Sequence, residues 1–279
     1  MEYTREQLEV LLDQAEHEGD YTKLLPLTLE YGKFVEADHG KKSLEYTSWM
    51  NDLGTIYRDI GSYEESEKTF LEANELLAEI ETRDGPNYAT SVNNTAGLYR
   101  RMKRYEDAER MFAECIRAYR ASLGENHFLF ISALNNLALV YQDEGRYDET
   151  EPLHKRCLEF LENDKEENNV IAIGTTLNNL GTLYQHQERY DEATATLQKA
   201  ADLYGRELGE DHPLYATSLN NLAYSRFLAG NYEEALAEFV RVVDITQRKF
   251  GKGSSYHNSA TRNLDIIKDM IAKQTGETQ

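Results

Sequence analysis

The sequence predicts an all-α protein that is built as a solenoid of antiparallel helix hairpins. Three observations favour this fold class: a unit of about 42 residues recurs along the chain, apolar residues inside each unit keep helical spacing, and four prolines occur in 279 residues. Repetition at this period is typical of solenoids, in which each unit buries its apolar face against its neighbours. Proline interrupts helix interiors, so its scarcity indicates an almost wholly helical chain.

Tyrosine marks the repeat most clearly, because it occurs once in each unit directly after a short turn phrase. Gly61-Ser62 precedes one of these tyrosines and Gly145-Arg146 precedes another. Most of them are followed by acidic residues, which the helix dipole favours in a first turn. The sequence therefore predicts a tight turn and a helix start at six places, 42 or 43 residues apart: Tyr21, Tyr63, Tyr105, Tyr147, Tyr190 and Tyr232.

Each unit contains two apolar stripes, one before the turn and one after it. In the third unit the first stripe is Leu134, Leu137, Ala138 and Tyr141, whose i, i+3, i+4, i+7 spacing is one face of a helix. Gly or Ala at the third place of this stripe lets a neighbouring helix approach closely. The second stripe is the predicted buried face of the second helix: Phe70 with Ala73, Phe112 with Cys115, His154 with Cys157, Leu197 with Ala200, and Phe239 with Val242.

These motifs resemble the tetratricopeptide repeat, whose usual unit is shorter. A 42-residue unit with Leu-Asn-Asn-Leu-Ala and the phrase from Leu208 to Pro213 is similar to the kinesin light chain type and its bacterial relatives. The resemblance covers about residues 44–250 and implies a right-handed superhelical solenoid whose first helices line a concave groove. It also implies that the protein binds another protein or a peptide there.

The expected domain organisation is one solenoid over residues 1–279. Residues 1–43 are expected to form an atypical first hairpin, and residues 44–254 are expected to form five repeats of about 42 residues. Residues 255–279 match only the first half of a repeat, which predicts a capping helix near 257–273 followed by a frayed tail. Terminal repeats usually depart from the pattern in this way.

The face of each first helix that lies opposite its apolar stripe is rich in asparagine. Asparagine is a mediocre helix former, so nine asparagines at equivalent mid-helix positions indicate a role beyond propensity. One interpretation is that a register bonds a neighbouring helix, and the other is that it grips a peptide backbone. The resemblance favours the register of Asn135 for binding. The first register is Asn51, Asn93, Asn135, Asn178 and Asn220, and the second is Asp52, Asn94, Asn136, Asn179 and Asn221.

Charges on this predicted groove cancel, although the whole chain carries a formal net charge of −20. Arg100 and Arg101 form a basic spot toward one end, and Tyr224, Phe227 and Leu228 form an aromatic, apolar end. This arrangement predicts a ligand with an acidic group at one end and a bulky apolar group at the other. Chaperone-binding relatives clamp a carboxylate with early Lys or Arg residues, but Ser or Thr stands at those positions in this chain.

Several other functions are disfavoured by the composition. The negative charge argues against nucleic-acid binding, because phosphate backbones require clustered Lys and Arg. No apolar run is long enough for a membrane span, and the acidic N-terminus does not resemble a secretory signal, so we expect a cytoplasmic protein. His127 and His212 recur in matching loops, which predicts a helix-entry role instead of metal binding. We expect buried, reduced thiols at Cys115 and Cys157, no cofactor, no metal site and no enzymatic activity.

Two functional interpretations follow. The first is a scaffold or adaptor that binds an extended peptide segment of a partner in the groove. The alternative is a regulatory receptor whose groove takes a short signalling peptide or a small molecule. Residues 1–43 are too short and too acidic for the DNA-binding domain that such receptors often carry, which favours the adaptor. The partner's identity and any homo-oligomerisation remain open at this stage.

Overall fold

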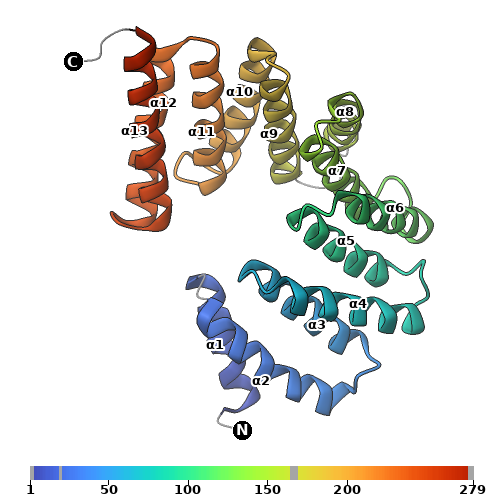
Figure 1. The fold of residues 1–279 in the computed structure, drawn as a ribbon. Helices are drawn as coiled ribbons and strands as arrows, with labels where there is room; N and C mark the ends of the chain where they lie inside the picture. The colour runs from blue at the N-terminus through green and yellow to red at the C-terminus, as the bar shows by residue number, and fades with distance from the viewer. Residues whose placement is uncertain (1–2, 19–20, 164–168, 276–279) are drawn as a thin grey trace. The chain divides into compact units, whose positions relative to one another are not determined.

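The computed structural model describes residues 3–18, 21–163 and 169–275, and these form helices joined by short turns without any strand (Figure 1). The helices fall into antiparallel pairs, as the sequence predicts. Their bounds are α1 Arg5–Glu18, α2 Tyr21–His39, α3 Leu44–Asp59, α4 Tyr63–Ile80, α5 Pro86–Arg101, α6 Tyr105–Ser122, α7 Phe128–Asp143, α8 Tyr147–Asn163, α9 Val170–His186, α10 Tyr190–Glu207, α11 Pro213–Leu228, α12 Tyr232–Phe250 and α13 Ser255–Thr275.

The predicted turns are confirmed, because each of the six tyrosines is the first residue of an even-numbered helix. Residues 19 and 20 of the first turn phrase lie outside the described residues. The residue two places before the tyrosine has a positive φ in the other five turns, with glycine at three of them. Lys103 and Glu188 adopt the same left-handed conformation with φ of 59° and 60°. A side chain there is strained, which glycine avoids.

The chain divides into two compact units, Met1–Val140 and Tyr141–Gln279, and we treat each as a separate body. The boundary falls inside α7. Consecutive helices pack in pairs within the units, for example α5 on α6 and α9 on α10. In addition α3 packs on α5, and α9 packs on α11, so successive first helices lie side by side. Whether residues 1–279 act as one solenoid stays a prediction.

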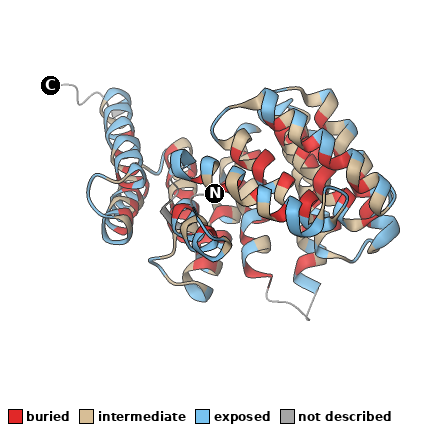
Figure 2. Cartoon of the chain, turned by 90° about the horizontal axis from the view of Figure 1, so that it is seen from below, coloured by how far each residue is buried: buried red, intermediate tan, exposed pale blue. Residues whose placement is uncertain are grey.

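The two predicted stripes lie in the core, which also contains residues outside them such as Tyr119 and Tyr204. Figure 2 shows buried residues alternating with exposed ones along the helices. The second-helix position that phenylalanine occupies in three hairpins is fully buried, and this includes His154 at 0% exposure. Cys115 and Cys157 are both buried and unbonded to another cysteine, as predicted. Burial raises the pKa of each thiol to about 12, which disfavours the reactive thiolate in the folded state.

A three-residue clasp joins successive hairpins, and the sequence analysis did not predict it. Tyr99 on α5 donates a hydrogen bond of 2.9 Å to Glu67 on α4. Arg104, in the turn after α5, also donates to Glu67 at 2.8 Å and stacks over the Tyr99 ring at 4.2 Å. The second unit contains an equivalent clasp. Tyr184 and Arg189 both donate to Glu151, at 3.0 and 2.8 Å, and Arg189 lies 4.2 Å from the Tyr184 ring centre.

Helix entry follows the loop motifs that the sequence analysis identified. His127 Nδ1 accepts a hydrogen bond from the backbone of Leu129, and His212 Nδ1 accepts one from Leu214, both at 3.2 Å. These imidazoles cap first helices, which confirms their helix-entry role. The capping helix α13 is two residues longer at each end than predicted, and residues 276–279 of the tail lie outside the described residues. No helix in the described ranges is long and apolar enough to cross a membrane.

Candidate functional site: the first-helix surface

The candidate site is the asparagine-bearing face of the first helices, which we call the first-helix surface. All nine predicted asparagines are present on it, and each is partly buried. They lie in the middle of α3, α5, α7, α9 and α11, two in each helix except α3. An asparagine side chain carries two donors and an acceptor, so a partly buried one can bond the stack and a ligand at once.

The two asparagine registers bond to each other across successive repeats. Asn94 Nδ2 on α5 donates to Asn51 Oδ1 on α3 at 3.1 Å, and Asn136 donates in the same way to Asn93 at 3.2 Å. The cap continues this pattern, because Asn263 on α13 donates to Asn220 on α11 at 3.3 Å. Both registers therefore contribute to the stacking of the repeats. The interpretation that amides bond a neighbouring helix is confirmed at these three places.

The second unit departs from this pairing. Asn178 donates to the Ser218 hydroxyl at 2.6 Å instead of to an amide, and Gln185 donates to the backbone oxygen of Asn221 at 3.1 Å. The side chains of Asn179 and Asn221 make no hydrogen bond within the described ranges. They occupy equivalent positions on the packed pair α9 and α11. Their amides are therefore available to a ligand, whereas those of the first register are engaged.

The predicted basic spot is present but partly neutralised. Asp59 Oδ1 lies 3.1 Å from Arg58 Nε and 3.0 Å from Arg101 Nη1, so one carboxylate shares two guanidinium groups. Arg101 is half exposed at 52% of its side chain. Arg100 lies next to it at the end of α5 and is partly buried. Two arginines that share one aspartate leave a net positive charge at this end of α3 and α5.

The aromatic end of the surface consists of Tyr224 alone. Its side chain is 42% exposed on α11, as expected. Phe227 was expected on the open face but is 4% exposed, and it packs on Tyr232 at the start of α12 with 5.7 Å between ring centres. The cap helix α13 also covers it through Leu264 and Ile267. Helical spacing indicates the direction of Phe227 but not the helices that enclose it.

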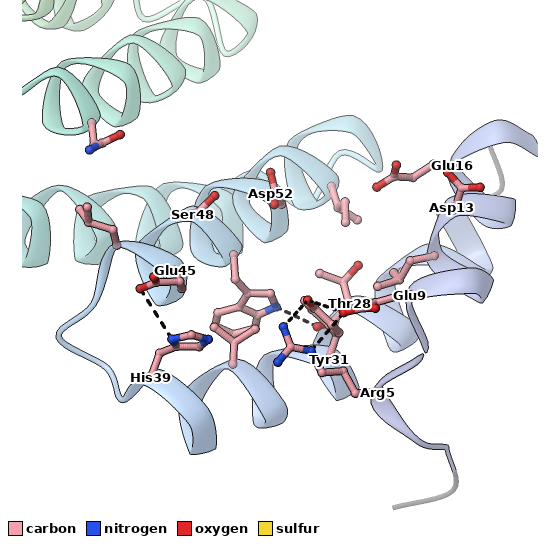
Figure 3. A pocket seen from close by; sticks show the side chains of 16 residues that line it. Arg5, Glu9, Asp13, Glu16, Thr28, Tyr31, His39, Glu45, Ser48 and Asp52 are labelled. Carbon is pink, nitrogen blue, oxygen red and sulfur yellow. Dashed lines mark hydrogen bonds and ion pairs between the residues drawn. The ribbon is translucent and has the colours of Figure 1, made fainter. Parts of the chain in front are cut away.

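A hollow at the N-terminal end of the first unit was not predicted. It measures about 660 Å³ and lies between α1, α2 and α3 (Figure 3). The carboxylates of Asp13 and Glu16 on α1 face that of Asp52 on α3 across it. In the sequence the only hint is that Asp52 replaces asparagine in the second register, while α1 carries several acids. Because these acids come from helices far apart in the sequence, only their packing reveals the hollow.

Comparison with known proteins identifies the family. A tetratricopeptide repeat model matches residues 45–121 and 172–248, and a second such model matches residues 130–163. The chain belongs to the tetratricopeptide repeat family. The matched segments contain the alternating first and second helices described above, with the tyrosine turns between them. None of the curated proteins compared with this tetratricopeptide chain matches its sequence.

Solved structures share the fold at low sequence identity. A kinesin light chain-type protein of Podosopora anserina with nearly identical repeats is 17% identical, with a TM-score of 0.60 over 71% of this chain and 93% of that one. BtubC from P. vanneervenii is 24% identical, with a TM-score of 0.62 over 75% and 82%. The apo form of the quorum sensor NprR from B. thuringiensis is 14% identical, with a TM-score of 0.67 over 96% and 70%. NprR in complex with its cognate peptide NprX is also 14% identical, with a TM-score of 0.63 over 99% and 74%.

Proposed function

We propose that this tetratricopeptide repeat protein is an interaction module that binds an extended segment of a partner protein along its first-helix surface. The observation that carries the proposal is the pair of unengaged amides, Asn179 and Asn221, beside the exposed ring of Tyr224. An amide binds a peptide backbone through both of its donors and its acceptor. An exposed aromatic ring next to the amides supplies apolar contact area at low conformational cost.

The asparagines of the first register differ from Asn179 and Asn221, and this difference supports the choice of those two residues. The first register is bonded inside the stack, so a ligand would have to compete with existing bonds there. Asn179 and Asn221 have no such bonds to lose, and Tyr224 lies three residues after Asn221 on the same helix face. We therefore place the peptide-binding contacts in the second register of the second unit. This choice differs from the register of Asn135 that the resemblance favours.

The first step of the test locates the bound segment. A photo-crosslinking amino acid replaces Tyr224 in one version of the full chain and Glu234, an exposed second-helix residue of the same unit, in another. Both versions are irradiated in native lysate, and mass spectrometry maps the crosslinked segments. The proposal expects one partner segment to be captured reproducibly at Tyr224 and not at Glu234. Equal capture at both positions would contradict a specific surface.

The second step measures the amide contribution with the synthetic form of the captured segment. Replacing both Asn179 and Asn221 by alanine should weaken binding about fivefold for each lost hydrogen bond, measured by calorimetry. Asn163→Ala, a substitution at an exposed position on α8, serves as the control and should leave the affinity unchanged. Unchanged affinity in the Asn179 and Asn221 double variant would refute the assignment of these residues.

A stability comparison separates a ligand-binding amide from a structural one. Asn136→Ala removes the donor to Asn93, whereas Asn179→Ala removes no bond that the described chain makes. Both substitutions replace the same residue type at the same helix position, so the gain in helix propensity cancels. The Asn136→Ala variant should therefore unfold at lower urea, by about 1 kcal/mol relative to Asn179→Ala. Equal free energies of unfolding for the two variants would mean that the Asn136 amide contributes no more to stability than the Asn179 amide does.

A regulatory receptor for a short signalling peptide is the second candidate. The observation that favours it is the NprR likeness, which extends over 99% of this chain, whereas the kinesin light chain-type likeness extends over 71%. A receptor should bind an isolated short peptide tightly and change its conformation. Small-angle scattering with and without the captured segment distinguishes the two, since an adaptor should keep the same scattering profile apart from the added mass.

A further inference from the structure

The hollow between α1, α2 and α3 has an aromatic floor that is held in place. Trp49 Nε1 donates a hydrogen bond of 2.8 Å to the backbone oxygen of Thr28, which anchors the indole against α2. Gly32 lies directly beneath the ring, since a Cβ at that position would come within 2.1 Å of it. Tyr31 donates to Glu9 at 3.2 Å and is fixed in the same way. These contacts leave partly exposed rings at the base of the hollow.

The rim of the hollow is acidic on the side of α1 and α3. Asp13, Glu16 and Asp52 are exposed there, and none of them pairs with a base among the described residues (Figure 3). Arg5 is the cation on the opposite side, and it is already bonded to Glu9 at 3.1 Å and Asp38 at 2.8 Å. Its guanidinium therefore does not neutralise the acids across the hollow. Although Asp52 is exposed, partial desolvation by the walls of the hollow, together with the negative charge of Glu16, raises its pKa.

We propose that this hollow receives a basic side chain, Arg or Lys, of a partner protein segment. The cationic head would lie between Asp52 and the acids of α1, and its aliphatic stem would lie on Trp49 and Tyr31. Attraction between a cation and an aromatic face adds to the attraction of the carboxylates. The inference goes beyond the proposed function, because the hollow lies in the first unit whereas Asn179, Asn221 and Tyr224 lie in the second. It adds that a partner segment carries a positive charge where it meets α1 and α3.

A metal ion fits the hollow less well than an organic cation. No group of three or more His, Cys, Asp or Glu side chains in the described ranges is placed to hold a metal ion. The acids of α1 and α3 instead lie around an open space of about 660 Å³ with aromatic rings at its base. Calcium and magnesium require converging oxygen ligands at about 2.0 to 2.6 Å. Aromatic rings beside dispersed carboxylates match a guanidinium or ammonium on an apolar stem.

Trp49 provides the measurement, because it is the one tryptophan of the chain. The full-length protein is titrated with a blocked tetra-arginine peptide, and tryptophan emission is recorded. Tetra-glutamine and tetra-glutamate peptides serve as neutral and acidic controls. We expect a saturable emission change with tetra-arginine that weakens at 0.5 M salt, since exposed charges are screened, and no change with the other two peptides. If tryptophan emission does not change with any of the three peptides, cation binding in the hollow is refuted.

A charge-matched pair of variants separates the hollow from the general acidity of the chain. Asp52→Asn with Glu16→Gln removes two acids from the hollow, and Glu64→Gln with Glu65→Gln removes two exposed acids from the start of α4. Both double variants have the same net charge. The first should bind tetra-arginine roughly three- to tenfold more weakly, and the second should bind it like the parent. Equal losses in both would mean that long-range charge alone attracts the peptide.

The same variants distinguish this inference from the proposed function. If a segment is captured at Tyr224 but tetra-arginine leaves Trp49 emission unchanged, the hollow inference fails while the proposed function stands. If no segment is captured at Tyr224 but tetra-arginine still requires Asp52 and Glu16, the hollow binds cations and the proposed function fails.

Discussion

His154 should make the stability of the second unit depend on pH. It is 0% exposed on α8, at the core position that Phe70, Phe112, Leu197 and Phe239 occupy in the other hairpins. Burial lowers its pKa from 6.5 to about 4, because the charged imidazolium is poorly solvated there. The folded protein therefore keeps this residue neutral at pH values at which the unfolded chain has already bound a proton.

The direction and size of the effect follow from linkage. Between pH 6.5 and about 4 the unfolded state binds more protons than the folded state, so stability is present above this window and is lost as the pH falls through it. A histidine with these two pKa values costs the folded state about 2 kcal/mol between pH 7 and pH 5. Because the group is fully buried, solvent does not reduce this figure as it would on the surface.

Urea unfolding followed by circular dichroism at pH 7 and pH 5 measures this effect. His154→Phe and His154→Leu restore the residues that the equivalent positions carry, and both should lose less stability than the parent over this interval, by about 2 kcal/mol. All other titrating groups are shared, so they cancel in the comparison. An identical pH dependence in the parent and in both variants would show that His154 does not titrate as its burial requires.

Two further predictions concern the turns and the thiols. Lys103→Gly and Glu188→Gly should each stabilise the protein by about 1 kcal/mol, because glycine adopts their positive φ without strain and stands in the equivalent turns. Calorimetry should record this as a higher melting temperature. A lowered melting temperature in both variants would contradict this reasoning. Cys115 and Cys157 should react with a bulky thiol reagent only as fast as the protein unfolds, since burial raises both pKa values to about 12; rapid labelling of the native chain would place them on the wrong helix face.

The local sequence pattern alone was sufficient to predict where the helix hairpins turn. Tyr63 and its equivalents begin second helices because a tight turn followed by acids is a local signal, readable without any partner. The capping imidazoles of His127 and His212 were recognised for the same reason, since each bonds a backbone group two residues away. The buried thiols followed from helical periodicity, which determines the face on which a residue lies.

Interactions between repeats could not be predicted in the same way. The clasp of Glu67, Tyr99 and Arg104 joins residues up to 37 positions apart, and no local rule pairs them. The bond from Asn136 to Asn93 was one of two open interpretations, because an amide on a helix face can bond a neighbour or a ligand. Phe227 was assigned to the wrong environment because α12 and α13 enclose its side of α11.

The sequence by itself determined the all-α fold class, the positions of the turns and the two apolar stripes of each repeat, because these depend on contacts within a turn or on helical spacing. Only the tertiary structure decided which amides are engaged and which acids share a hollow. Asn94 is bonded while Asn179 is not, although both hold the same place in their repeats. Asn94 donates to Asn51 on the neighbouring helix α3, and side-chain partners across helices are decided by packing.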